Sequence, residues 1–262
     1  MARDMDNISI IDTTADNIGK YGICSYKDVK QDGFCRKIEW MKARHSEGLQ
    51  IKTLYSETGK TQGMIEYVPG EYCWRPVIAP GYMFIHCIFV GFRKDYKGKG
   101  YGTQLLNECI ADARKENMHG VAVVSREGTW MAKKEFFLKN GFTVVDTASP
   151  DFQLLALRFD KNAPLPKFAG DCDKKLARYG NGLTILRSDQ CPPLAKAIKE
   201  ISETAEKVYD IKPRIVELKT YKDAQDSPCA FGTFCVIYNG KIVAHAPISN
   251  TRFKNIMNKL MK

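Results

Sequence analysis

The sequence predicts a mixed α/β fold in two domains, and three observations lead to that prediction. At 262 residues the chain is longer than the roughly 150 residues of an average domain. Residues 160–167 read Asp-Lys-Asn-Ala-Pro-Leu-Pro-Lys, and two prolines so close together disfavour both helix and central strand. Strand and helix periodicities alternate on both sides of this linker. We therefore expect one domain at residues 1–162 and a second at 163–262.

The first domain should contain both strands and helices, because its apolar spacing changes repeatedly between the two periods. The helix expected at residues 33–47 carries Phe34, Ile38 and Met41 on one face. Residues 56–60 form a hairpin signal between two strands. The strands expected are 8–11, 49–55, 62–68, 82–92, 121–124, 142–145 and 152–159, and the further helices are 103–117 and 129–140.

The second domain is expected to follow the order β-α-β-β-β-α. Asn239 and Gly240 predict a tight hairpin turn between two of its strands. Its strands are expected at residues 183–187, 214–219, 234–238 and 241–245, and its helices at 193–208 and 249–260.

Charge and hydropathy limit the partners. Forty Lys and Arg against 30 Asp and Glu give a net charge of +10, which favours anionic partners such as phosphorylated cofactors. The basic residues are dispersed, so we expect no nucleic-acid partner. The longest apolar run, residues 83–90, is shorter than the roughly 20 residues that span a bilayer, so no membrane partner is expected. The N-terminal residues do not resemble a signal peptide, which favours a cytoplasmic location. A homodimer is compatible with these observations.

The nine cysteines are expected to be thiols. They form no C-x-x-C pair and no Cys/His cluster at zinc spacing, and a chain of this length does not need disulfides for stability. No metal site is therefore predicted.

A glycine-rich loop precedes the helix expected at residues 103–117. It reads Lys97-Gly-Lys-Gly-Tyr-Gly-Thr103, with glycines at alternate positions. Such glycines let the backbone approach a ligand closely, and the helix N-terminus favours an anion. The dinucleotide fingerprint fails because its third glycine would be Leu105, and no G-K-[ST] completes a P-loop. A lysine-rich surface turn is the alternative explanation for this loop.

This loop resembles motif A of the GNAT acetyltransferases, [Q/R]-x-x-G-x-[G/A]. Downstream, residues 136–142 resemble the F-Y-x-x-x-G-F segment of the same family. The resemblance covers about residues 5–160 and implies a GNAT acyl-CoA acyltransferase fold, acetyl-CoA as cosubstrate, and an N-acetyltransferase that acts on an amine acceptor. The residues that it implies for cofactor binding are Val90, Gly91, Phe92, Lys97, Gly98, Lys99, Gly100, Tyr101, Gly102, Thr103, Trp130 and Phe137.

Three residues depart from the family pattern. Lys97 keeps a positive charge but lacks the planar geometry of arginine. Phe137 stands where many members have a tyrosine that protonates the departing thiolate, and Trp130 lies near the place of a CoA-contacting asparagine. A general acid is not essential, because a thiol with a pKa near 8.5 is already a tolerable leaving group.

Amine attack needs a base, since an alkyl ammonium has a pKa near 10. Counted back from motif A, His86 falls where the histone-acetylating branch of the family places its catalytic glutamate. Imidazole can accept a proton near neutral pH. A shift of one residue in the strand would present Cys87 instead, and Glu66 and Tyr67 on the preceding strand are further candidates. A histidine with a purely structural role in the core is the alternative interpretation.

The second domain resembles a thioredoxin-like domain, and the combination resembles acetyltransferases with a YoaP-type C-terminal domain. Cys191 precedes two prolines at an expected helix start, where helix N–H groups favour a thiolate, but the second cysteine of C-x-x-C is missing. We expect no disulfide exchange. The predicted function is direct acetyl transfer to an unidentified amine in a ternary complex. The alternative is a CoA-binding regulatory or thiol-sensing protein with lapsed transferase activity.

Overall fold

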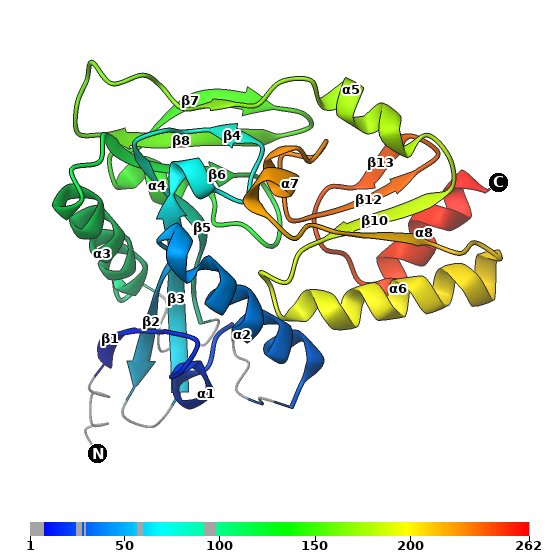
Figure 1. Ribbon diagram of the computed structural model, residues 1–262, viewed down its shortest axis with the longest axis horizontal. Coiled ribbons are helices and arrows are strands. Elements are labelled where there is room, and N and C mark those ends of the chain that lie inside the picture. Colours follow the sequence, from blue (N-terminus) through cyan, green and yellow to red (C-terminus); the bar gives the residue numbers. More distant parts are fainter. Residues whose placement is uncertain (1–7, 25–27, 29, 57–59, 92–97, 262) are drawn as a thin grey trace. The chain divides into compact units, whose positions relative to one another are not determined.

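The structure is a computed structural model that describes residues 8–24, 28, 30–56, 60–91 and 98–261. It divides into two compact units (Figure 1). Unit 1 comprises Met1–Tyr72 and Ile78–Lys167, and unit 2 comprises Cys73–Val77 and Phe168–Lys262. The domain boundary that the sequence predicts at residues 162 and 163 stays a prediction.

Unit 1 is built on a seven-stranded sheet in the order β1-β2-β3-β5-β6-β8-β7. Neighbouring strands run antiparallel except β5 and β6, which are parallel. The strands of this sheet are β1 (Ile8–Asp12), β2 (Gln50–Ser56), β3 (Lys60–Pro69), β5 (Tyr82–Val90), β6 (Gly120–Ser125), β7 (Thr143–Ala148) and β8 (Phe152–Arg158). The helices are α1 (Ile18–Tyr21), α2 (Asp32–Arg44), α3 (Tyr101–Lys115) and α4 (Lys134–Lys139). Two short strands, β4 (Val77–Ile78) and β9 (Lys167–Phe168), pair with each other.

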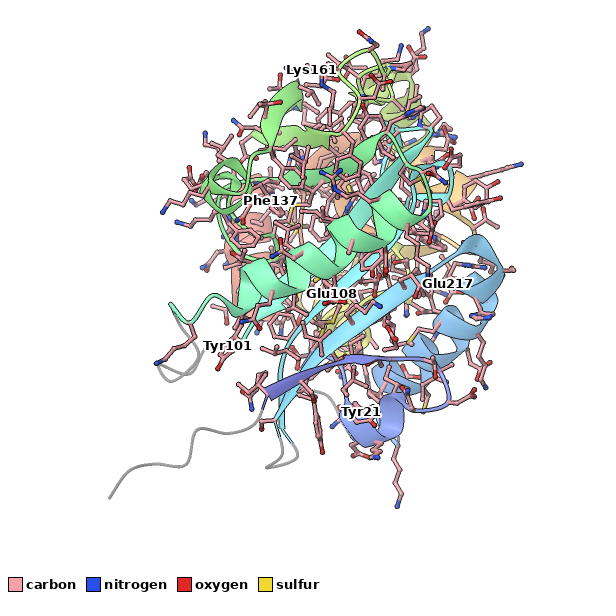
Figure 2. The ribbon with its side chains drawn as sticks, turned by 90° about the vertical axis from the view of Figure 1, so that its left-hand side faces the viewer. Tyr21, Tyr101, Glu108, Phe137, Lys161 and Glu217 are labelled. Atoms are coloured by element: carbon pink, nitrogen blue, oxygen red, sulfur yellow. The ribbon has the colours of Figure 1, made fainter. Side chains whose placement is uncertain are left out.

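Helices cover both faces of this sheet. Leu105, Leu106 and Cys109 repeat at helical spacing on α3 and are wholly buried against the sheet, together with residues of α4. Figure 2 shows α3 lying across this face, with Tyr101 in its first turn and α2 on the opposite face. The main apolar core therefore lies between the sheet and α3, and the second layer lies under α2.

The helix predicted at residues 129–140 is wrong at its N-terminal end. Gly128 and Trp130 both have positive φ, at 110° and 77°, and α4 begins only at Lys134. A positive φ is incompatible with a right-handed helix and is rare for a bulky side chain. Residues 129–133 are therefore an irregular connection, which the apolar periodicity alone does not reveal.

An extra residue in β5 changes its pairing with β3. Glu66 pairs with Cys87 and the next residue, Tyr67, pairs with Ile85, so His86 has no opposite residue and forms a β-bulge. The pairing keeps Ile85 and Ile88 on the face that α3 covers, since both belong to its core cluster. Cys87 shares the face of Glu66, because directly opposed residues lie on the same side of a sheet.

Unit 2 contains a four-stranded sheet in the order β11-β10-β12-β13. Strand β10 is parallel to β11 and antiparallel to β12, and β12 is antiparallel to β13. The strands are β10 (Leu183–Arg187), β11 (Arg214–Glu217), β12 (Phe234–Tyr238) and β13 (Lys241–Ala244), and the helices are α5 (Cys172–Leu176), α6 (Pro193–Tyr209), α7 (Tyr221–Gln225) and α8 (Asn250–Leu260).

Between β11 and β12, unit 2 has a helix, α7, that the sequence analysis missed. Helix α7 begins with a capping box, in which Thr220 and Asp223 bond to each other's backbone N–H groups. It has only five residues, too few to show helical periodicity. The thioredoxin-like assignment of this unit stays a prediction.

Two general features of the chain concern membranes and disulfides. In the part of the chain that the structure describes, we find no helix with both the length and the apolar character needed to cross a bilayer. All nine cysteines are free thiols, as the sequence predicts.

The lack of a side chain at Gly120 allows β6 and β8 to lie close together, and a substitution there can test this packing. A Cβ at Gly120 would lie 2.2 Å from the carbonyl oxygen of Leu157, a backbone atom that cannot move without disturbing β8. We expect Gly120→Ala to reduce the free energy of unfolding by about 1–3 kcal/mol or more, as overpacking does, in a denaturant titration. Gly170→Ala is the control, since its added methyl meets nothing within 4 Å. Equal stability of the two variants would contradict the β6–β8 packing.

Candidate active site

The glycine-rich loop meets the first turn of α3 in an open conformation. Gly98 and Gly100 adopt left-handed backbone angles, with φ of 73° and 79°, and a Cβ at either would meet no atom within 4 Å. Gly100 is the N-cap of α3, and its carbonyl accepts a hydrogen bond from the Gln104 N–H at 3.0 Å. The N–H groups before Gln104 belong to the first helical turn, which has no acceptors within the helix. This start of α3 can therefore bind an anion.

Gly102 brings three elements together at the same place. A Cβ there would lie 3.2 Å from Cε2 of Phe136 on α4 and 3.7 Å from Cγ2 of Val90 at the end of β5. Glycine thus allows the first turn of α3 to pack against α4 and β5. Of the residues predicted to bind the cofactor, Phe92 and Lys97 lie outside the described residues.

Strands β5 and β6 separate close to this helix start. Their parallel pairing covers Tyr82 to Ile85 on β5 and Gly120 to Val123 on β6. Beyond it, β5 continues along β3 and β6 continues along β8. The predicted residues His86, Cys87 and Val90 therefore lie on the part of β5 that has left β6. The N–H of Gly91, one of the residues predicted to bind the cofactor, donates a hydrogen bond to the carbonyl of Gln62.

The imidazole of His86 lies beside a buried ion pair. Its Nδ1 is 3.3 Å from Oε1 of Glu66, and the other carboxylate oxygen of Glu66 is 2.5 Å from Nζ of Lys37 on α2. The exposed fractions of the His86, Glu66 and Lys37 side chains are 0%, 2% and 0%. The sequence analysis identified Glu66 and His86 but missed Lys37. These three residues are called the His86 triad below.

Aromatic rings enclose the triad. The Lys37 ammonium lies 4.1 Å from the ring centroid of Trp40, a cation–π contact. The His86 ring meets those of Trp40 and Phe84 edge-on, at centroid distances of 6.5 and 5.9 Å. Because these rings exclude water, the charges of the triad act on each other in a medium of low dielectric constant.

Glu66 is ionised in this environment. Burial opposes the charged form, but the Lys37 ammonium and the contacts to His86 outweigh it and lower the pKa of Glu66 to about 2. An ionised carboxylate beside Nδ1 favours the tautomer with a proton on Nδ1, which leaves Nε2 as the ring nitrogen able to accept a proton. The arrangement can orient a general base.

The other predicted residues have different surroundings. Cys87 is half-buried opposite Glu66. Phe137 is wholly buried, with its ring 5.1 Å from that of Phe136 and 5.5 Å from that of Phe142, whereas Trp130 is 45% exposed. The contacts of Phe137 and Trp130 with a cofactor stay predictions.

Unit 1 also contains a cavity of about 450 Å³ at the end of β6 and the β7–β8 hairpin. Its lining includes Ser125, Arg126 and Lys134, and Arg126 forms a 2.9 Å ion pair with Asp151, which also lines it. None of the described residues predicted for the site lines this cavity.

Comparison with known proteins identifies the class. Residues 18–142 match the acetyltransferase (GNAT) family, and residues 214–255 match the family described as YoaP-like. Over 254 residues the chain is 34% identical to the protein named uncharacterized N-acetyltransferase YoaP from Bacillus subtilis (strain 168), and this match covers 95% of the chain and 98% of the relative.

Solved structures give weaker similarities. A GNAT-family acetyltransferase from Staphylococcus aureus Mu50 is 14% identical with a TM-score of 0.43, and covers 58% of this chain and 99% of its own. The PaiA N-acetyltransferase from Thermoplasma acidophilum, in complex with coenzyme A, is 15% identical with a TM-score of 0.40, at 58% and 99% coverage.

The sequence matches define the chain as an N-acetyltransferase. It belongs to the GNAT acetyltransferase family and carries a YoaP-like C-terminal segment, as the motif resemblance predicts.

Lys37 tests the electrostatics of the triad. Removal of one partner of a buried ion pair leaves the other charge uncompensated, so we expect Lys37→Met to lower the free energy of unfolding by about 3–5 kcal/mol at pH 7. Glu66→Gln removes the carboxylate charge that Lys37→Met leaves uncompensated. The double variant Lys37→Met/Glu66→Gln should therefore recover much of the lost free energy of unfolding in the same denaturant titration. A double variant that loses the sum of the single losses would contradict the coupling.

The pH dependence gives an independent check of the same pair. Since the folded-state pKa of Glu66 is about 2 against an ordinary value of 4.5, its contribution to stability is present above pH 4.5 and is lost as the pH falls towards 2. In Glu66→Gln the free energy of unfolding should therefore change less with pH between about 2 and 4.5 than it does in the parent. The slope should fall by an amount that corresponds to at most one bound proton.

Proposed function

We propose that the chain transfers the acetyl group of acetyl-CoA directly to the amine of an acceptor, within a ternary complex and without an acyl-enzyme. The observation that carries this proposal is that β5 contains both His86 and Val90, and that Cγ2 of Val90 would lie 3.7 Å from a Cβ at Gly102 in the first turn of α3. When bound, acetyl-CoA supplies a thioester, an acyl group already activated towards amines.

Binding of the cofactor is assigned to the start of α3. The open space beside Gly98 and Gly100 supports contact between a pyrophosphate and the backbone, and the N–H groups of the first turn provide the donors. Lys99 in the same loop adds a positive charge. The residues present thus fit the phosphorylated end of acetyl-CoA.

We assign to His86 the removal of a proton from the acceptor amine. With Nδ1 3.3 Å from a carboxylate oxygen of Glu66, Nε2 takes a proton from the ammonium form of the acceptor as the amine attacks. The Glu66 charge stabilises the imidazolium that results, as a carboxylate does in a Ser-His-Asp triad. The proposal requires the acceptor to reach Nε2 past the rings of Trp40 and Phe84, since the His86 side chain is 0% exposed.

No side chain is needed to protonate the leaving group. The phenyl ring of Phe137 carries no proton to donate, and its burial places it in the packing of α4. A thiol of pKa near 8.5 leaves as a thiolate at neutral pH. Cys87 is half-buried on the same strand, but direct transfer does not require it as a nucleophile.

Gly100→Val tests the binding loop. A β-branched residue strains the left-handed backbone and fills the space assigned to the pyrophosphate, so we expect the Kd for CoA to rise about tenfold or more, which corresponds to 1.4 kcal/mol. Isothermal titration calorimetry measures this directly. Gly182→Val is the matched control, because Gly182 has a similar φ of 72° and equally open surroundings but lies in unit 2. If Gly100→Val binds CoA like the parent, the loop assignment is wrong.

His86→Ala tests the base. We expect kcat to fall about 10²-fold at pH 7, with partial recovery at high pH as the acceptor amine loses its proton in solution. The Kd for CoA should stay unchanged. Cys87→Ser is the control and should retain kcat. An unchanged pH–rate profile in His86→Ala would transfer the role to Glu66 or water, and loss of activity with an acyl-protein detected by mass in the parent would favour Cys87.

A further inference from the structure

One short segment of the β3–β5 connection lies in unit 2, although the residues on either side of it lie in unit 1. Unit 1 extends to Tyr72 and resumes at Ile78, whereas Cys73–Val77 forms part of unit 2 together with Phe168–Lys262. All five residues of this segment, Cys-Trp-Arg-Pro-Val, are buried. The proposed acetyl transfer assigns no role to them. Cys73–Val77 is called the inserted segment below.

Two hydrogen bonds hold the backbone of the inserted segment. The side-chain amide of Gln225, the last residue of α7, donates to the carbonyl of Cys73 at 3.2 Å. The N–H of Ala169 donates to the carbonyl of Pro76 at 2.8 Å. Proline has no N–H, so this position presents no donor that would need a partner on burial. Unit 2 thus binds the segment partly through its main-chain carbonyl groups, as peptide-recognition sites do.

Gly232 lets the inserted segment lie directly against the main chain of unit 2. A Cβ at Gly232 would lie 2.4 Å from the carbonyl oxygen of Trp74 and 2.8 Å from Cα of Arg75. These are backbone atoms, which cannot rotate away as the end of a side chain can. The φ of Gly232, 77°, also favours glycine. The contact therefore requires the absence of a side chain at this position.

Side chains of the inserted segment add specific contacts. Nη1 of Arg75 donates to Oγ1 of Thr233 at 3.4 Å, and Cζ of Arg75 lies 4.6 Å from the ring centroid of Phe231. The Trp74 side chain is only 1% exposed. Tryptophan and arginine are the residue types that most often dominate the energy of a protein–protein contact.

The residues of unit 2 that contact the inserted segment are fixed by bonds of their own. The N–H of Gly232 donates to the carbonyl of Cys229 at 2.8 Å, and the N–H of Thr233 donates to that of Phe231 at 2.9 Å. The carbonyl of Thr233 accepts the N–H of Ser188, the residue after β10, at 3.0 Å. Because the turn at residues 229–233 is ordered in this way, binding of a peptide there costs little conformational entropy.

We propose that unit 2 is a peptide-binding module whose ligand, the inserted segment, comes from the acetyltransferase part of the same chain. The turn at residues 229–233 lies within the YoaP-like match, and the inserted segment lies within the GNAT match. The segment connects β3 and β5, the strands that carry Glu66 and His86, so its binding restrains the connection between them. It also attaches unit 2 a second time, besides the covalent link at residue 167. The fragments should therefore stay together when the linker is cut.

The first test cuts the chain between Lys161 and Asn162, two exposed residues, at a specific protease site inserted there. We expect fragments 1–161 and 162–262 to co-elute in size-exclusion chromatography at micromolar concentration, because the first contains the inserted segment and the second contains its site. This test changes no residue of the segment or of its site. Separation of the fragments would overturn the proposal.

Cysteine alkylation of the cut protein shows whether the inserted segment is what holds the fragments. Cys73 is 0% exposed, and burial raises the pKa of its thiol to about 11, so it should react slowly with N-ethylmaleimide at pH 7 while the segment is bound. The exposed thiol of Cys35 is the internal control and should react rapidly. Mass spectrometry of the peptides measures both rates. If the fragments co-elute but Cys73 reacts as fast as Cys35, a different contact holds them and the proposal is wrong.

Gly232→Ala tests the contact in the uncut protein. The added Cβ meets the carbonyl oxygen of Trp74, so the segment should leave its site more often and Cys73 should be alkylated about tenfold faster or more than in the parent. Gly182→Ala is the matched control and should behave like the parent. Gly182 also lies in unit 2, with a φ of 72°, and an added Cβ there would meet no described atom within 4 Å.

Two buried thiols distinguish release of the segment from unfolding. Cys109 in unit 1 and Cys235 in unit 2 are both 0% exposed, and both should stay protected in Gly232→Ala. Alkylation of Cys73 at the parental rate would contradict the contact at Gly232. Equal acceleration at all three thiols would show that the segment does not leave its site as a ligand does, and it would also overturn the proposal.

Discussion

The proposed acetyl-transfer site depends on one extra residue in β5. In a regular strand alternate residues face the same side, so Ile85 and Ile88 would lie on opposite faces. The bulge at His86 restores the register, and both isoleucines contribute to the core under α3. It also leaves His86 and Cys87 on the side of Glu66. A single inserted position thus preserves the apolar core on one face and gathers the polar groups on the other.

Those polar groups are stable only as a set. A buried carboxylate needs a compensating charge, and Lys37 provides it from α2 at 2.5 Å. This ties the packing of a helix to the ionisation of a strand residue. The depressed pKa keeps Glu66 charged at neutral pH and above, where the acceptor amine loses its proton. The same ion pair links α2 to the sheet and places a charged carboxylate beside His86, the proposed base.

The sequence revealed those parts that depend on local spacing. The alternate glycines predicted a loop at a helix start whose backbone a ligand can approach, and the surroundings of Gly98 and Gly100 are open in this way. Strand β10 has the predicted bounds. The face of His86 was not predictable, because a bulge arises from pairing between strands rather than from the residues of one strand. Lys37 was missed because lysine on a helix is usually solvated. Its position, three residues after Phe34 and four before Met41 on the apolar face, was the signal that could have found it.

The proposed base depends on Lys37 only through Glu66. Nδ1 of His86 lies 3.3 Å from one oxygen of the Glu66 carboxylate, and Lys37 lies beside the other oxygen. Burial alone would favour a neutral carboxyl group, which carries no charge to stabilise an imidazolium. The Lys37 ammonium keeps this carboxylate ionised, and the carboxylate charge is what the proposed proton transfer to Nε2 requires. A lysine that does not contact the imidazole is therefore a condition for the proposed role of His86.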